Sequence, residues 1–277
     1  MTGRLILCGT PIGNLEDVTH RAERVLREAD VIACEDTRRT RKLLTHLGIK
    51  ARELVVYHEG NERRQAGPLV NRAKKGGTVV LVSDAGMPGL SDPGYELVRA
   101  CIAADIPVEI VPGPTAAVSA LAVSGLPPAR FVFEGFFPRK AGERRRRIAE
   151  LADEPRTLVI YESPHRIAAC LQDLLDGLGD RPTALVRELT KLHEDVRRGP
   201  LSELLRAIED DPPRGEITLV VGGAVRGHRA EPSSAELAAR ARSLMGSGTE
   251  RKEALARTAR EAGVSRRRVF DALVEDA

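Results

Sequence analysis

Three glycine- and proline-rich loops, each directly after a short apolar run, constrain the fold more than any other feature. The loops lie at residues 9–14, 83–94 and 111–116, and the runs before them at 5–8, 79–82 and 108–111. Short apolar runs that are rich in β-branched residues and followed by glycine are typical of buried strands. Loops at the carboxyl ends of such strands form the ligand sites of open α/β sheets, and glycine there lets the backbone approach a ligand closely. The sequence therefore predicts a preformed small-molecule site in the first half of the chain.

A regular alternation of short apolar runs with longer amphipathic segments fills residues 4–123. It predicts strands at 5–8, 31–34, 54–57, 79–82 and 108–111, and helices at 20–29, 38–47, 61–75, 94–104 and 115–124. Such βα alternation is typical of a largely parallel sheet. A stretch rich in proline and glycine at 124–128 interrupts the pattern, so we expect an N-terminal α/β domain at residues 1–124.

The next hundred residues predict a second α/β domain, at 129–225, with a mixed sheet and a ligand cleft between the two domains. Its expected strands are 131–134, 157–161, 183–188 and 216–221, and its expected helices are 143–152, 165–176 and 201–208. A polar linker at 227–234 follows this domain.

Residues 235–277 predict a small all-α module, with helices at 235–245, 250–262 and 266–275. Their spacing is that of a helix-turn-helix, and Ser265 is placed to cap the third helix. The formal net charge of +3 lies entirely in residues 226–277, which hold 11 Lys or Arg and 8 Asp or Glu. A helix-turn-helix contacts nucleic acid or docks another protein, and the sequence leaves both roles open.

Composition and cysteine placement exclude several classes of protein. No apolar stretch approaches the roughly 20 residues of a membrane helix, and the N-terminal apolar run is too short for a signal peptide. The four cysteines lie far apart without a CxxC pair, which predicts buried, reduced thiols in a cytoplasmic protein. Aromatic residues make up only 3% of the chain and Trp is absent, so we expect an aliphatic core and no aromatic stacking platform.

The motifs of several other enzyme classes are missing. The chain contains neither the GxGxxG dinucleotide fingerprint nor the Walker A pattern. It also lacks HExxH and GxSxG. The sequence thus offers no motif for metal-dependent hydrolysis or for a serine nucleophile, and we expect no metal site.

Eight short motifs, in order along the chain, resemble the tetrapyrrole methylase superfamily of S-adenosylmethionine-dependent methyltransferases. They lie at residues 9–22, 35–38, 83–94, 111–116, 135–138, 161–166, 187–191 and 215–216. Within the superfamily, the sequence most resembles bacterial enzymes that methylate the ribose 2′-hydroxyl of a cytidine in 16S ribosomal RNA. The resemblance implies this activity, S-adenosylmethionine as the methyl donor, 16S ribosomal RNA or the small ribosomal subunit as the partner, and a homodimer.

The resemblance also implies a donor site built from the three loops. Its residues would be Ser83, Asp84, Ala85 and Gly86 beside the methionine part, Thr115 and Ala116 beside the adenosine, and Pro11 in the pocket wall. A carboxylate in a ligand loop suits the positive sulfonium of S-adenosylmethionine. Because this donor is already activated, the enzyme mainly has to position it for in-line attack. For Asp84 and Asp92 the alternative is turn formation, because Asp caps local backbone well.

A ribose 2′-hydroxyl is a poor nucleophile and must lose its proton as it attacks. The candidate catalytic residues are Lys191, Asp36 and Glu35. A lysine with a lowered pKa can act as a base, and a carboxylate can orient the hydroxyl. The alternative for these residues is ion pairing at the domain interface.

Clustered Arg and Lys residues suit the phosphate backbone of RNA. The candidate RNA-binding residues are Arg38, Arg139, Lys140, Arg144, Arg145, Arg266 and Arg267. Charge runs also occur as solvated helix faces. The basic clusters and the helical module argue against a first rival function, methylation of a small tetrapyrrole. A second rival is a non-catalytic nucleic-acid-binding protein whose cleft senses a ligand.

Overall fold

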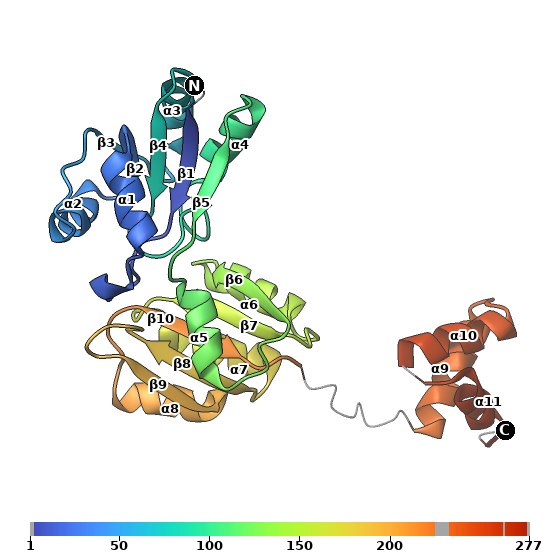
Figure 1. Ribbon diagram of the computed structural model, residues 1–277. Coiled ribbons are helices and arrows are strands. Elements are labelled where there is room, and N and C mark those ends of the chain that lie inside the picture. Colours follow the sequence, from blue (N-terminus) through green and yellow to red (C-terminus); the bar gives the residue numbers. More distant parts are fainter. Residues whose placement is uncertain (1–2, 225–232, 263, 276–277) are drawn as a thin grey trace. The chain divides into compact units, whose positions relative to one another are not determined.

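The computed structural model describes residues 3–224, 233–262 and 264–275, and the chain forms two compact units, Met1–Ala224 and Val225–Ala277 (Figure 1). Most of the linker expected at 227–234 lies outside the described residues. The first unit contains both sheets. We call the first sheet with its helices, up to residue 114, the first lobe, and residues 115–224 the second lobe.

A parallel five-stranded sheet forms the first lobe, as predicted. Its strands are β1 (Arg4–Cys8), β2 (Val31–Cys34), β3 (Leu54–Val56), β4 (Thr78–Val82) and β5 (Val108–Val111), in the order β3-β2-β4-β1-β5. The short helix η1 (Leu15–Asp17) follows β1, and the α-helices are α1 (His20–Glu28), α2 (Thr37–His46), α3 (Glu62–Lys74) and α4 (Tyr95–Ala103). One aliphatic core includes residues of α1 and α2 and another residues of α3 and α4, so the sheet is covered on both faces.

A mixed five-stranded sheet forms the second lobe, also as predicted. Its strands are β6 (Phe131–Phe136), β7 (Thr157–Glu162), β8 (Pro182–Arg187), β9 (Asp195–Pro200) and β10 (Ile217–Val221), in the order β6-β7-β10-β8-β9. Among these described strands, only β6 and β7 pair in parallel. The sequence analysis missed β9, because this edge strand carries Asp195, Arg197 and Arg198 instead of an apolar run.

Four helices cover the second sheet. They are α5 (Ala116–Ser124), α6 (Ala141–Glu150), α7 (Ile167–Leu178) and α8 (Leu201–Asp210). Thr115 caps α5 by accepting a hydrogen bond from the Val118 N–H. Ala120 and Leu121 of α5 pack with Val159 and Val220 of the second sheet. The chain therefore crosses to the second sheet before α5.

Three helices form the C-terminal unit, in agreement with the sequence. They are α9 (Ser234–Gly246), α10 (Arg251–Ala262) and α11 (Arg266–Glu275). The Ser265 hydroxyl accepts a hydrogen bond from the Arg268 N–H at 3.2 Å, so Ser265 caps α11 as expected. The helices share a small core that includes Leu237, Val269 and Leu273.

The structure also bears on the expectations about cysteines and membranes. All four cysteines are buried and free. Within the part of the chain that the structure describes, no helix combines the length and the apolar character needed to cross a membrane.

Candidate functional site

The loops after β1, β4 and β5 meet, because β4 and β5 flank β1 in the sheet. Thr10 and Gly86 exchange two backbone hydrogen bonds, of 2.9 and 3.1 Å, and the Thr10 hydroxyl donates to the Ser83 carbonyl at 3.3 Å. The Gly9 N–H donates to the Val111 carbonyl at 2.9 Å. The three loops singled out in the sequence therefore form one continuous, hydrogen-bonded surface.

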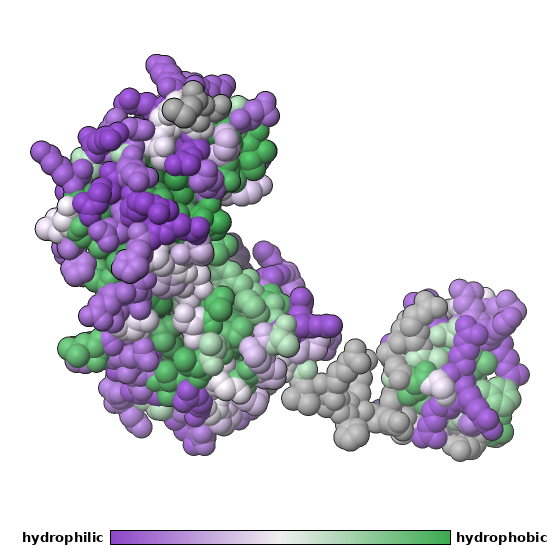
Figure 2. Space-filling model, in the orientation of Figure 1, coloured by the Kyte–Doolittle hydropathy of each residue, from purple (hydrophilic) through white to green (hydrophobic). Residues whose placement is uncertain are grey.

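A cavity of about 560 Å³ opens beside this surface and is lined by residues of both lobes. Figure 2 shows the surface hollowed between the parts that carry the two sheets, with hydrophobic residues beside the hollow. A second cavity of about 230 Å³ shares Ile12, Arg39, Asp84, Ala85 and Glu216 with the first. We call them the large and the small cavity.

All seven expected donor-site residues line one or both cavities. Gly86, Thr115 and Ala116 line the large one, Pro11 and Ser83 the small one, and Asp84 and Ala85 both. The loops thus bring together residues that are separated by up to about a hundred positions in the sequence.

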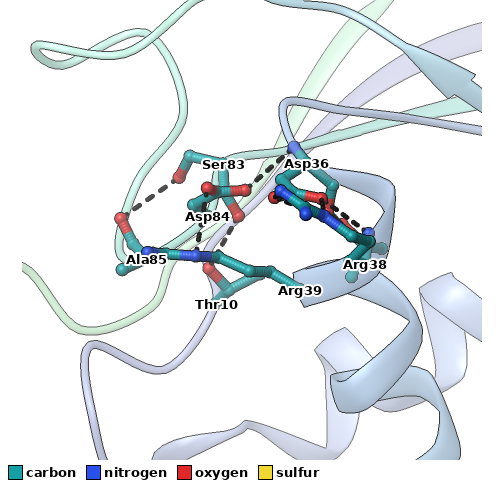
Figure 3. Close-up of polar contacts among 8 residues, drawn as sticks. Thr10, Asp36, Arg38, Arg39, Ser83, Asp84 and Ala85 are labelled. Atoms are coloured by element: carbon teal, nitrogen blue, oxygen red, sulfur yellow. Dashed lines mark hydrogen bonds and ion pairs between the residues drawn. The ribbon is translucent and has the colours of Figure 1, made fainter.

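Asp84 ties its loop to the start of α2 (Figure 3). One carboxylate oxygen accepts a hydrogen bond from the Asp36 N–H at 3.0 Å, and the other lies 3.5 Å from Nε of Arg39. The Asp84 side chain is only 20% exposed. Asp84 therefore anchors the basic helix α2 in addition to facing both cavities.

Asp36 is the N-cap of α2, where its carboxylate accepts a hydrogen bond from the Arg38 N–H at 2.8 Å and pairs with the Arg38 guanidinium at 2.8 Å (Figure 3). These bonds to Arg38 lower the pKa of Asp36 to about 2. A carboxylate that is so acidic and so fully engaged is a weak proton acceptor near neutral pH.

Lys191 lies in the loop between β8 and β9 and lines the small cavity. Its Nζ lies 2.8 Å from Oε1 of Glu188 and 3.1 Å from Oε2 of Glu216. Burial opposes the charge, but the hydrogen bonds to the two carboxylates outweigh burial and raise the pKa of Lys191. The side chain is therefore held as a cation, whereas a general base would need a lowered pKa.

The Lys191 loop has a constrained backbone and joins the two lobes. Glu188 and Thr190 adopt left-handed φ values of 49° and 66°, which L-residues adopt only when the surroundings enforce them. The Thr190 hydroxyl accepts a hydrogen bond from the Asn14 N–H at 3.1 Å. A Cβ atom at Gly13 would lie 2.4 Å from Cγ of Lys191, so only glycine fits there.

Asp92 lines the large cavity, and its carboxylate can accept a proton near neutral pH. Burial, together with the negative charges of Glu35 and Asp84, raises the pKa of Asp92 to about 7. Burial and Asp84 also raise the pKa of Glu35, which lines neither cavity. The sequence analysis treated Asp92 only as a donor-loop or turn residue, because its neighbours come from another part of the chain.

One of the candidate RNA-binding residues is misassigned. Arg144 is buried and pairs with Asp173 of α7 at 2.7 Å, so its guanidinium serves the core of the second lobe. The other candidates, all exposed, are Arg38, Arg139, Lys140 and Arg145 in the first unit and Arg266 and Arg267 in the C-terminal unit. Helical periodicity alone does not separate Arg144 from Arg145, because the clustered arginines run around the helix.

The few aromatic residues of the chain are concentrated in one place, although the sequence led us to expect no aromatic stacking platform. The protein has five Phe and three Tyr residues, and half of these eight line the large cavity, namely Phe131, Phe133, Phe136 and Tyr161. Composition reports how many aromatic residues a chain has, whereas the fold decides where they gather.

Comparison with known proteins identifies the family. The family model described as Tetrapyrrole (Corrin/Porphyrin) Methylases matches residues 4–205. Ribosomal RNA small subunit methyltransferase I of Thermotoga maritima is 49% identical over 221 residues, which are 80% of this chain and 99% of that protein. The protein of the same name from Mycobacterium tuberculosis is 46% identical over 277 residues, covering 99% of this chain and 95% of that protein.

Solved structures agree with this result. Uroporphyrin-III C-methyltransferase from Thermus thermophilus, in complex with S-adenosylhomocysteine, is 26% identical with a TM-score of 0.56, covering 81% of this chain and 99% of that one. Cobalt precorrin-4 methyltransferase shares the fold, with a TM-score of 0.58 and 20% sequence identity. The match covers 80% of this chain and 95% of that one. The chain belongs to the tetrapyrrole methylase family and, within it, to the ribosomal RNA small subunit methyltransferase I group.

Proposed function

We propose that this protein is an S-adenosylmethionine-dependent methyltransferase that methylates the ribose 2′-hydroxyl of a cytidine in 16S ribosomal RNA. The observation that carries the proposal is the large cavity, where three glycine-rich loops meet residues of the second lobe. Membership of the ribosomal RNA methyltransferase group supports the substrate class. We also propose that the protein acts in the cytoplasm.

The cavity residues fit a sulfonium donor. The Asp84 carboxylate supplies a negative charge at the wall that both cavities share, and the backbone around Gly86 leaves room for a close approach. When bound, S-adenosylmethionine supplies an activated methyl group, so the protein mainly has to align it with the attacking oxygen.

We propose that Asp92 accepts the proton of the 2′-hydroxyl as that oxygen bonds to the methyl carbon and the carbon–sulfur bond breaks. Its position in the large cavity and its pKa of about 7 support this role. Lys191, held as a cation beside the small cavity together with Arg39 and Lys42, is proposed to balance the charge of RNA phosphates. Asp36 and Glu35 are proposed to act indirectly, by holding α2 and by setting the charge around Asp92.

Methyl transfer from labelled donor to unmethylated small ribosomal subunits tests the function. A ribose 2′-O-methyl group blocks alkaline cleavage at its nucleotide, so mapping after hydrolysis distinguishes ribose from base methylation. Label on a tetrapyrrole and none on RNA would establish the small-molecule rival. Tight donor binding without any transfer would establish the ligand sensor.

The Asp84→Ala variant is expected to bind S-adenosylmethionine about 10- to 150-fold more weakly, because a charge-assisted contact contributes roughly 1.5–3 kcal/mol. Calorimetry measures the affinity. Asp84→Asn is the matched control for the hydrogen bond to Asp36, since the amide oxygen still accepts from that N–H. If Asp84→Asn binds like the parent while Asp84→Ala does not, Asp84 holds α2 and its charge does not contact the donor.

The C-terminal unit is proposed to bind RNA through Arg266, Arg267 and Arg268. These three exposed cations open α11, where the helix dipole disfavours positive charge, so helix stability does not explain them. The Thermotoga relative aligns along nearly its whole length with 80% of this chain, so about a fifth of this chain has no counterpart in that protein.

A variant that ends at residue 224 is expected to raise the KM for small subunits far more than it changes donor affinity. The slope of log affinity against log salt should become shallower by about 0.7 for each phosphate of single-stranded RNA that the shortened protein no longer neutralises. Gln substitutions at Arg266, Arg267 and Arg268 in the full chain should reproduce most of this change. Equal slopes for all three proteins would mean that the unit makes no phosphate contacts.

We also propose a homodimer. Ile102 on α4 is 63% exposed, and Ile110 on the edge strand β5 is 57% exposed. Exposed apolar side chains on an unpaired edge strand and a neighbouring helix are typical of a surface that a second subunit covers.

A further inference from the structure

A β-bulge turns Phe136 of β6 onto the face of the strand that carries Phe131 and Phe133, and all three rings line the large cavity. Phe133 pairs with Val159 and Gly135 with Ile160, so Glu134 is an extra residue in the strand. Without the bulge, Phe133 and Phe136 would lie on opposite faces of the sheet, because side chains alternate along a strand. Gly135 has a φ of 62°, which glycine adopts without strain, and a Cβ there would lie 2.7 Å from Oγ of Ser91. The local backbone is thus built to gather these rings.

Tyr161 holds the rings in a defined arrangement. Its ring centroid lies 5.1 Å from that of Phe133, edge to face at 74°, and 5.5 Å from that of Phe136, tilted by 57°. The Tyr161 hydroxyl accepts a hydrogen bond from the Ala117 N–H at 3.1 Å, which fixes the ring against the start of α5. We call Phe133, Phe136 and Tyr161 the aromatic wall.

The outer ring of the wall is open to solvent. Phe136 is 56% exposed, whereas Phe137, the next residue, is 2% exposed in the core of the lobe. A ring that lines a cavity and still reaches solvent can contact a group that enters from outside while attached to a larger molecule. A donor enclosed by the glycine-rich loops does not need such a ring.

Two basic residues follow the exposed ring by three and four positions in the chain. Arg139 and Lys140 are both exposed, and Arg139 has no ion-pair partner among the described residues. The turn that leads to them is fixed, because Arg166 donates hydrogen bonds to the Phe137 carbonyl at 2.9 Å and to the Pro138 carbonyl at 3.1 Å. An aromatic ring beside basic residues is the usual arrangement for binding the bases and phosphates of single-stranded nucleic acid.

We propose that Phe136, supported by Phe133 and Tyr161, stacks on the base of the nucleotide to be methylated, and that Arg139 and Lys140 contact the adjacent phosphates. This inference rests on the proposed RNA substrate. A nucleotide whose ribose enters the cavity leaves its own stack, and stacking on an aromatic side chain offsets part of that cost. The ligand of the wall is therefore an unstacked nucleobase carried by RNA.

Three substitutions at Phe136 test the stacking. F136A and F136L are expected to lower kcat/KM for unmethylated small subunits by about 5- to 150-fold, as expected when one base is no longer stacked. F136W should retain the activity of the parent, because the indole still stacks. Filter binding of the subunits should follow the same order without requiring turnover, and donor affinity should stay unchanged in all three variants. Tyr95→Ala, which removes a 65% exposed ring that lines neither cavity, is the control and should behave like the parent.

The adenine of the donor is the competing occupant, and F136W separates the two because the chain has no other Trp. S-adenosylhomocysteine alone should leave the emission of the introduced indole unchanged. Quenching by S-adenosylhomocysteine, or subunit binding by F136L that equals the parent, overturns the proposal. If the parent protein methylates a base, or transfers no methyl group to RNA, the proposed function is overturned instead. The order of subunit affinities in filter binding would still test whether the aromatic wall binds RNA, because that measurement needs no turnover.

Discussion

The Asp92→Asn variant is expected to transfer methyl groups about 10²–10⁴ times more slowly than the parent in single turnovers on saturating small subunits. The amide cannot accept the hydroxyl proton, although it keeps the size of the side chain. The parent's rate should rise with pH through about 7 and then level off, since only ionised Asp92 accepts a proton and its pKa is about 7. The variant should lack this rise.

The raised pKa of Asp92 also predicts that a slow Asp92→Asn variant is slow because of its chemistry and not because it is unfolded. The folded-state pKa of Asp92 is raised above its ordinary value, so ionising this group costs stability as the pH rises toward 7. Asp92→Asn removes that cost and should not destabilise the fold near neutral pH. Glu35→Gln removes a negative charge that raises the pKa of Asp92, so it should shift the midpoint of the pH profile downward. If Asp92→Asn stays within about threefold of the parent, well short of the general-base range, the proton goes elsewhere, and Lys191→Met is the next variant to measure.

The Arg144→Ala variant is expected to lose about 3–5 kcal/mol of unfolding free energy, because it leaves the Asp173 carboxylate buried without its main partner. The Arg144 and Asp173 side chains are 7% and 9% exposed. Chemical denaturation measures the loss. The double variant Arg144→Met with Asp173→Leu should recover much of the stability, since apolar residues of similar volume often replace a buried ion pair without loss.

Arg145→Ala is the matched control for Arg144→Ala, because it removes the neighbouring exposed arginine, a candidate RNA-binding residue. Its side chain is 62% exposed and lies 3.8 Å from the Asp173 carboxylate. We expect this variant to change stability little and to make the salt dependence of subunit binding shallower. A stable Arg144→Ala protein with a shallower salt dependence would restore Arg144 as an RNA-binding residue.

The sequence predicted the elements with a strong local pattern. Runs such as residues 79–82 are continuously apolar, so a buried parallel strand was the simplest interpretation, and β4 forms there. Strand β9 has no such run, since ion pairs such as Arg197 with Asp195 and Asp211 take the place of an apolar face. Its pairing with β8 is a long-range property that no window of sequence contains.

For the candidate site, too, the sequence predicted the features with a local pattern and missed those that depend on long-range contacts. The loop residues were visible because glycine and proline mark a special backbone wherever they occur. Asp92 and the aromatic wall were not, because their properties come from neighbours brought by other elements, such as Glu35 for the pKa of Asp92 and the bulge at Glu134 for the direction of Phe136. Arg144 and Arg145 are adjacent in sequence, and only the packing of α6 on α7 distinguishes them.

The contact between the loops at Gly13 and Lys191 has a consequence for motion between the two sheets. The Asn14–Thr190 hydrogen bond and the close packing of Gly13 on Lys191 join loops that belong to different sheets. A hinge motion that parts the sheets would have to break both contacts, and the strained backbone at Glu188 and Thr190 would lose the support that holds it. Closure would restore the support. The loop at 188–191 would then hold the two sheets together around the cavities until both contacts break.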